Sequence, residues 1–182
     1  VYLSINGSKQ GLYVLEENFG KELIERNKKR NGPIFSLLSE YDWNIYDTKF
    51  EVYNKQYWSR PENLELVDFA RKKIKNFLDG NIKTNDVFDL KKWAWFFATT
   101  DLTYTFHGTD PNNVKMYYNP VNGLIEPIPY DGHRVNKNFN ENLSNFESKT
   151  NFEMAKDCFT NIKICKKNDP ANFWKYNLFY NK

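Results

Sequence analysis

The spacing of apolar residues near the start of the chain predicts a β-hairpin. Residues 1–5 alternate between apolar and polar positions at period two, which is typical of a half-exposed strand. Asn6 and Gly7 then form a hairpin turn signal, loosened by three polar residues, and residues 11–15 supply the returning strand. We therefore expect two short antiparallel strands at this end.

A short helix, a strand and a loop are predicted next. Residues 19–29 place apolar side chains among charged ones at helical spacing. Gly32 and Pro33 follow that helix and lead into a brief apolar strand over 34–38. Residues 39–62 are rich in aromatic and turn-forming residues, which predicts an ordered loop or insertion.

Two longer amphipathic helices are predicted in the middle of the chain. Residues 63–78 repeat apolar side chains at spacings of three and four, and Gly80 ends the helix as a C-terminal cap. Asp89 is expected to cap the next helix, which is strongly aromatic. The side chains expected on its buried side are Trp93, Phe96, Phe97 and Thr100.

A second hairpin is predicted after the aromatic helix. Its strands are residues 113–118 and 124–130, joined by a turn that contains Gly123. Pro127 and Pro129 interrupt the second strand, which restricts that strand to the edge of a sheet. The rest of the chain is expected to hold a polar loop over 136–151 and a last helix over 152–166.

Three polar residues lie at the ends of these elements. Asp101 ends the aromatic helix, Asn113 begins the second hairpin and Asp131 follows it. Pairing of the two strands would bring Asn113 and Asp131 to one open end, with Asp101 one loop away. Magnesium prefers such oxygen ligands, and phosphoryl transfer needs a further carboxylate to orient the attacking hydroxyl. Asp and Asn are also common caps and turn residues, so spacing alone leaves a structural role open.

Composition restricts the classes of function. A chain of 182 residues with net charge +3 fits one compact unit, and its short basic clusters are separated by acids. This pattern does not predict nucleic-acid binding, which needs a basic stripe on one face. No apolar run approaches 18 residues, so no membrane span is expected. Cys158 and Cys165 lack partners at zinc spacing, and both a disulfide and two buried thiols remain open.

Several separated motifs resemble those of the CotH kinase family, the spore coat protein H-like atypical protein kinases. Gly11–Glu17, followed by Phe19–Glu25 and Gly32–Phe35, is similar to the family's G-x-Y-x-x-x-E strand and the helix after it. A second block resembles the signature D…H…N-x-R-x-Y-x-x-P…G-x-L-x-P-I-x-x-D. It consists of Asp101, His107, Asn113–Pro120 and Gly123–Asp131.

The resemblance implies an α+β, protein-kinase-like fold in one domain. Residues 1–38 would form the end of the N-lobe sheet and the hinge. Residues 63–135 would form the catalytic core, with a metal-binding hairpin in a mainly helical C-lobe, and residues 136–182 a C-terminal extension. The implied activity is phosphoryl transfer from ATP, with Mg²⁺ or Mn²⁺, to hydroxyls of a protein acceptor. A cell-surface or secreted location is favoured by the same resemblance.

The resemblance also implies roles for single residues. Asp101 matches the catalytic aspartate that orients the acceptor hydroxyl. Asn113 and Asp131 match the metal ligands, and Glu17 matches a cofactor-binding carboxylate near the junction of the lobes. His107 matches a recurrent position, where packing or hydrogen bonding in the loop is favoured over a direct chemical role.

The chain also departs from the family pattern. The upstream His-x-Arg-Gly-Asn-Ser segment and a lysine suited to the ATP phosphates are not found in these residues, and Ser36 stands where a basic residue is expected. After Asp131 the second acid of many members is missing, which leaves Arg134 and Lys115 as candidate phosphate-binding cations. We therefore expect the chain to lack an N-terminal ATP-gripping segment and to be inactive alone.

Two alternatives remain open, of which only the first follows from these departures. One is a pseudokinase or interaction module that keeps the fold without phosphoryl transfer. The other is a carbohydrate- or surface-binding protein, although packing is favoured over sugar stacking for the aromatic side chains that suggest it. Those side chains are Tyr41, Trp43, Tyr46, Tyr53, Tyr57 and Trp58.

Overall fold

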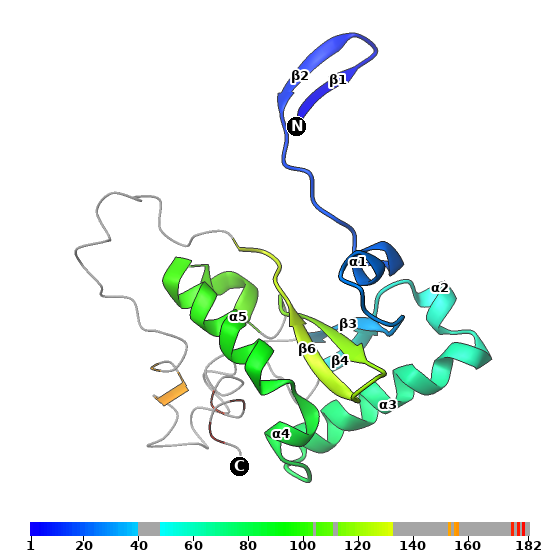
Figure 1. The fold of residues 1–182 in the computed structure, drawn as a ribbon, viewed down its shortest axis with the longest axis vertical. Coiled ribbons are helices and arrows are strands. Elements are labelled where there is room, and N and C mark those ends of the chain that lie inside the picture. The colour runs from blue at the N-terminus through cyan, green and yellow to red at the C-terminus, as the bar shows by residue number, and fades with distance from the viewer. Residues whose placement is uncertain are drawn as a thin grey trace.

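The chain has an α+β fold with two antiparallel sheets (Figure 1). The computed structural model describes residues 1–39, 48–103, 105–110 and 113–132, together with Glu153, Ala155, Lys156, Tyr176, Leu178 and Tyr180. The predicted loop over 136–151, both cysteines and Arg134 lie outside these residues. Of the helix predicted over 152–166, only residues 153, 155 and 156 are described, and each is helical.

The larger sheet has four strands in the order β4-β3-β5-β6. These are β3 (Ile34–Ser39), β4 (Thr48–Val52), β5 (Lys115–Asn119) and β6 (Leu124–Ile128). The predicted strand over 34–38 and the predicted second hairpin are therefore confirmed. β6 lies at the edge of the sheet, as its prolines predicted.

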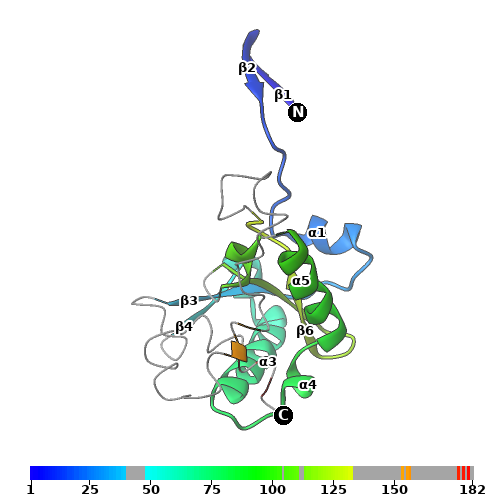
Figure 2. The same cartoon turned by 90° about the vertical axis from the view of Figure 1, so that its left-hand side faces the viewer.

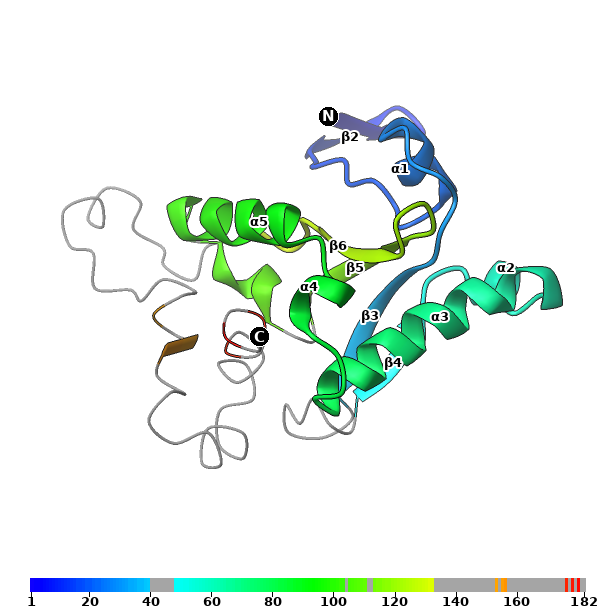
Figure 3. The same ribbon diagram turned by 60° about the horizontal axis from the view of Figure 1, so that its bottom comes forward.

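Three helices cover one face of this sheet. They are α3 (Pro61–Leu78), α4 (Thr84–Val87) and α5 (Leu90–Thr103). Figure 3 shows α3 running beside β3 and β4, and α5 running beside β5 and β6. The main core lies between sheet and helices, and it includes Phe35, Leu37, Met116, Tyr118 and Ile125 from the strands and Ala70, Ile74, Phe77, Trp93, Phe96 and Phe97 from the helices.

The C-terminal cap of α3, and the N-terminal cap and buried side of α5, agree with those predicted from the sequence. Gly80 follows α3 with φ +74°, the left-handed conformation that a glycine cap adopts readily. The Asp89 carboxylate accepts a hydrogen bond from the Lys92 backbone N–H at 3.2 Å, so the predicted cap is confirmed. The four residues predicted to lie on the inner side of α5 are all buried.

The opposite face of the sheet is covered by α1 (Lys21–Arg26), a shorter helix than the one predicted over 19–29. Ile24 of α1 packs against Ile34 and Tyr117 in a second apolar cluster. The Tyr117 hydroxyl donates a hydrogen bond to the Arg30 carbonyl at 2.5 Å. Figure 2 shows α1 and α3 on opposite sides of the sheet, which therefore lies between two helical layers.

The smaller sheet is the predicted N-terminal hairpin, formed by β1 (Tyr2–Ile5) and β2 (Ser8–Leu12). The prediction placed the returning strand at residues 11–15, but it starts at Ser8. Asn6 and Gly7 both have positive φ, at 50° and 81°, so they complete a tight two-residue turn without the polar residues that follow. The hairpin projects from the rest of the chain (Figure 1). Most of its large apolar side chains are exposed, including Val1, Tyr2, Ile5 and Leu12.

The loop predicted over residues 39–62 is wrong where the structure describes it. Residues 48–52 form β4, which pairs along its whole length with β3. Residues 55–58 form α2 (Lys55–Trp58), and α3 already begins at Pro61. Pairing with β3 and burial of Trp58 stabilise these elements, and neither effect is visible in a composition rich in turn residues. Among the described residues, no helix has the length and apolar character needed to cross a bilayer.

Candidate functional site

The open end of the β5–β6 hairpin gathers polar side chains around one histidine. Nδ1 of His107 lies 2.5 Å from Oδ2 of Asp131. The Asn113 side-chain amide donates a hydrogen bond to the His107 carbonyl at 3.1 Å. Asn113 and Asp131 both contact His107, so the structure brings together the two predicted metal ligands.

The backbone around His107 is packed directly against the segment that carries Asp131. His107 lies in the short 3₁₀ helix η2 (Phe106–Thr109). A Cβ added to Gly108 would lie only 2.1 Å from the carbonyl oxygen of Tyr130, so a side chain there would clash. Because glycine permits this approach, the neighbouring His107 can reach the carboxylate.

Asp131 has an unusual backbone conformation. Its φ of +54° lies in the left-handed region, which costs a non-glycine residue on the order of 1 kcal/mol, with Asp among the more tolerant types. Strain of this kind persists only where the surroundings fix the residue, and here the His107 contact holds the side chain. Asp131 is half-buried, as are His107 and Asn113.

Asp101 lies in the last turn of α5 and is half-buried. The backbone N–H of Thr105 donates to the carbonyl of Thr100 at 3.1 Å, which fixes the start of the connection from α5 to η2. α5 and η2 pack against each other. The structure thus places Asp101 on the helix that precedes the His107 cluster, which consists of His107, Asn113 and Asp131.

Glu17 lies in the segment between β2 and α1. Its carboxylate is 3.3 Å from the guanidinium of Arg26, so its described contact is with α1 and not with the His107 cluster. The adjacent Glu16 acts electrostatically on Tyr130, the residue before Asp131. Loss of solvent, and then the negative charges of Glu16 and Asp131, raise the pKa of the Tyr130 phenol.

An aromatic group adjoins Asp131 that was not predicted from the sequence. The ring of Phe19 lies between those of Tyr53 and Tyr130, with centroid distances of 4.9 Å to each. The ammonium of Lys115 lies 5.1 Å from the Tyr130 ring centroid and 5.9 Å from that of Tyr53. Lys115 is the first residue of β5 and lies two residues after Asn113 in the chain.

A buried ion cluster fixes the hairpin from the side of β6. The Glu126 carboxylate is fully buried and lies 2.5 Å from the Lys29 ammonium and 2.7 Å from that of Lys92. Asn119 donates a further hydrogen bond to it at 2.8 Å. Burial acts to raise the pKa of Glu126, but the three hydrogen bonds outweigh burial and hold it below its ordinary value. This cluster ties β6 to α5 and to the connection before β3, and it was not predicted from the sequence.

The donor set suits a hard cation that also takes ligands from a substrate. The described residues contain no group of three or more His, Cys, Asp or Glu side chains that could hold a metal. Asn113 and Asp131 nevertheless offer an amide and a carboxylate oxygen at one place. Magnesium is commonly bound by one or two side chains, completed by water and phosphate oxygens. The two residues fit this requirement and would not make a closed structural zinc site.

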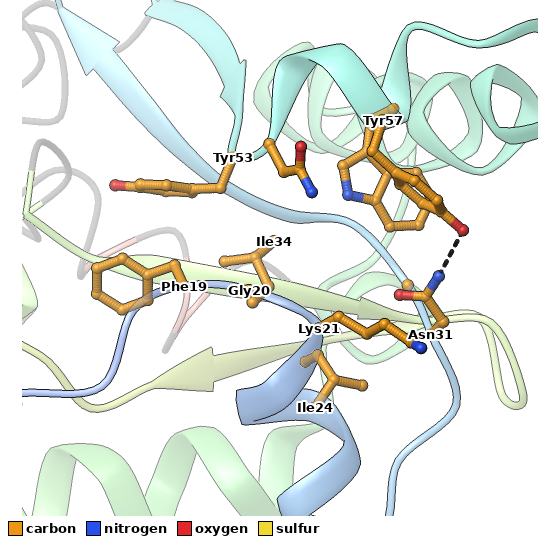
Figure 4. A pocket seen from close by; sticks show the side chains of 11 residues that line it. Phe19, Gly20, Lys21, Ile24, Asn31, Ile34, Tyr53 and Tyr57 are labelled. Carbon is orange, nitrogen blue, oxygen red and sulfur yellow. Dashed lines mark hydrogen bonds between the residues drawn. The ribbon is translucent and has the colours of Figure 1, made fainter.

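A pocket lies on the α1 side of the sheet, near the aromatic group (Figure 4). Phe19, Tyr53 and Tyr57 line it, and the Asn31 side-chain amide donates to the Tyr57 hydroxyl at 2.9 Å. Trp58 also lines this pocket. The structure thus brings together three of the aromatic residues noted in the sequence, whereas residues 41, 43 and 46 lie outside the described part.

A second, mainly apolar groove lies between α5 and β6, and the segment after β6 also lines it. Its walls include Trp95 and Thr99 on the helix and Pro127 and Pro129 on the opposite side. Tyr130 and Gly132, the two neighbours of Asp131 in the chain, also line the groove. The groove therefore lies beside the segment that carries Asp131.

Comparison of the chain with models of protein families, with curated proteins and with solved structures found no match.

Proposed function

We propose that the protein is a CotH-like phosphotransferase with a protein-kinase-like fold, which transfers a phosphoryl group from ATP to a hydroxyl of a protein acceptor. The observation that carries the proposal is the contact of both Asn113 and Asp131 with His107 at one end of the β5–β6 hairpin. Phosphoryl transfer requires a metal ion held by oxygen ligands, and the side chains of Asn113 and Asp131 offer such ligands at this end of the hairpin. The ordered resemblance of separated motifs supports the same proposal.

In this proposal each polar residue has a distinct task. The Asp131 carboxylate and the Asn113 amide oxygen would hold Mg²⁺ or Mn²⁺, which supplies positive charge to the phosphate groups. His107 is a positioning residue, because its ring holds Oδ2 of Asp131 at 2.5 Å. Asp101 would accept a hydrogen bond from the acceptor hydroxyl and orient its oxygen for attack.

The acceptor would approach through the groove between α5 and β6. Tyr130 and Gly132 line this groove, so a hydroxyl-bearing side chain bound there would lie near the segment that carries Asp131. Its walls provide apolar surface from Trp95 and Pro129 for neighbouring residues of the acceptor. Binding energy from such remote contacts positions the reacting group.

The test is metal-dependent nucleotide binding by the full-length protein. ATP should bind only with Mg²⁺ or Mn²⁺, and Asp131→Ala should abolish that binding. Asp79→Ala is a matched control, since its carboxylate forms an exposed ion pair with Lys75 on α3. ATP binding that is independent of metal in both wild type and Asp131→Ala would refute the proposal.

Turnover separates an active enzyme from a pseudokinase that binds nucleotide without transfer. Asp101→Ala should retain ATP binding and lose phosphorylation of an acceptor, measured with labelled ATP. If the wild-type protein binds Mg·ATP but transfers no phosphate to any protein or to itself, the pseudokinase alternative holds. This alternative is motivated by the sequence, in which the family's lysine for the ATP phosphates is not found and Ser36 stands where a basic residue is expected.

Carbohydrate binding is the second candidate, favoured by one specific observation. Tyr53, Tyr57 and Trp58 line a single pocket that also presents the Asn31 amide. Aromatic faces and amides are common partners of small polar ligands in such pockets. Binding on a glycan array that survives Asp131→Ala but is lost in Tyr57→Ala would favour this candidate over phosphoryl transfer.

A further inference from the structure

We infer that Lys115 is the cation of an anion-binding site beside Asp131, and that this site receives phosphate groups of a nucleotide. The inference rests on the proposed function for the identity of the ligand. The anion site itself rests on the position and burial of one lysine, and on the lack of an anionic partner for it among the described residues. The proposed metal ligands do not require it.

Lys115 points to the side of the sheet that carries α1. It is the first residue of β5, and alternation along the strand places it on the same face as Tyr117, which packs on that helix. Directly opposite on β3 is Ser36, the position where the sequence led us to expect a basic residue. The cation missing from β3 is thus present on the neighbouring strand, within one cross-strand spacing.

The ammonium is enclosed by aromatic rings. Lys115 is only 7% exposed, and its Nζ lies 5.1 Å from the ring centroid of Tyr130 and 5.9 Å from that of Tyr53. Cation–π attraction to two rings offsets only part of the cost of removing an ammonium from water. The geometry holds the charge in place without neutralising it.

No anion partner for Lys115 is found in the part of the chain that the structure describes. Its described interactions are the two ring contacts. The contrast with Lys29 and Lys92 is direct, because both of these contact the buried carboxylate of Glu126. A buried charge is normally paired, so an ammonium without a carboxylate indicates that a ligand supplies the negative charge.

Phosphate is the anion that fits this position. The Lys115 ammonium lies over the ring of Tyr130. The next residue in the chain is Asp131, one of the two candidate metal ligands. A nucleotide phosphate chain has several charged oxygens and can contact a metal and an ammonium together, which a single carboxylate does less well. Lys115 would thus neutralise the phosphates from the sheet side while the metal does so from the side of Asp131.

The experiment compares Lys115→Met, Lys115→Gln and Lys115→Arg in the full-length protein, with Lys75→Met as a control at an exposed ion pair. Calorimetric titration with Mg·ATP should show binding weaker by roughly ten- to a hundred-fold in the Met and Gln variants. The Arg variant should stay within a few-fold of wild type. Without ligand, the Met variant should melt at or above the wild-type temperature, because it no longer buries an unpaired charge.

Inorganic pyrophosphate without metal tests the anion site independently of the proposed function. It should raise the melting temperature of the wild type and of Lys75→Met, but not that of Lys115→Met or Lys115→Gln. This result would support the anion site even if Mg·ATP binding failed and refuted the phosphotransferase. Unchanged Mg·ATP affinity in the Met and Gln variants, or no pyrophosphate effect on the wild type, would overturn the inference.

Discussion

Glu126→Gln is expected to destabilise the protein far more than a typical loss of an ion pair. The carboxylate is fully buried and accepts hydrogen bonds from Lys29, Lys92 and Asn119. The substitution keeps the volume of the side chain and creates no cavity. It removes the negative charge and replaces one acceptor oxygen by an N–H group that faces ammonium donors.

The magnitude follows from the burial of the three partners. Hydrogen bonds to a charged group contribute about 1.5–3 kcal/mol each, and breaking a buried ion pair costs about 3–5 kcal/mol. The side chains of Lys29 and Lys92 are 29% and 45% exposed, so both can regain solvent after the substitution. We therefore expect a loss of about 3 kcal/mol in the free energy of unfolding, at the low end of that range. For a chain of this size this equals roughly 6–12 °C in Tm.

The assay is urea unfolding followed by tryptophan fluorescence at several pH values. The pKa of Glu126 is held below its ordinary value of 4.5 in the folded state. Its charge therefore stabilises the fold fully above about pH 4.5, and this contribution is lost as the pH falls through the folded-state pKa. The difference between wild type and Glu126→Gln should be constant from about pH 6 to 8 and should shrink below about pH 4.5.

The control is Glu51→Gln, which removes an exposed ion pair with Lys55 and should cost less than about 1 kcal/mol. A loss at Glu126 no larger than that at Glu51 would refute the reasoning. So would a difference that persists undiminished well below about pH 4.5, since the missing charge would then not be its cause.

Two further substitutions test the backbone around the site and the start of the aromatic helix. Gly108→Ala should push η2 away from the Tyr130 carbonyl, cost about 1–3 kcal/mol and weaken metal-dependent ATP binding, whereas Gly132→Ala is a control whose nearest contact would be an ordinary 3.8 Å. Equal melting temperatures and affinities for the two variants would contradict this prediction. Asp89→Ala should cost about 0.5–2 kcal/mol in thermal unfolding, because it removes the helix cap and the ion pair with Lys92. A loss confined to a few tenths of a kcal/mol would show that the cap contributes little.

Elements with local signals could be predicted from the sequence. The turn at Asn6 and Gly7 indicated the first hairpin, and the apolar spacing of residues 63–78 indicated most of α3. The second hairpin was predicted in the same way, and pairing of its strands correctly placed Asn113 and Asp131 at one open end. Hydrophobic periodicity and turn-forming residues are signals within a few neighbouring residues. These elements can therefore be predicted from a single sequence.

Contacts between distant segments could not be predicted. Lys29 and Glu126 are 97 residues apart, and nothing in either neighbourhood indicates the other. The same holds for Phe19 beside Tyr130, which connects the segment before α1 to the candidate site. β4 was missed because its strand character depends on pairing with β3, and aromatic, turn-rich composition pointed to a loop.

The central position of β3 has a consequence for synthesis of the protein. β3 can pair with β4 once both strands have been made, but its other edge has no partner until β5 is made, because Ser36 and Lys115 are about eighty residues apart. At translation rates of about 5–20 residues per second, that edge stays open for on the order of 4–16 s. An open strand edge beside Phe35 and Leu37 is a template for intermolecular pairing. Nascent chains that stall before β5 should therefore bind chaperones strongly and aggregate when these are depleted.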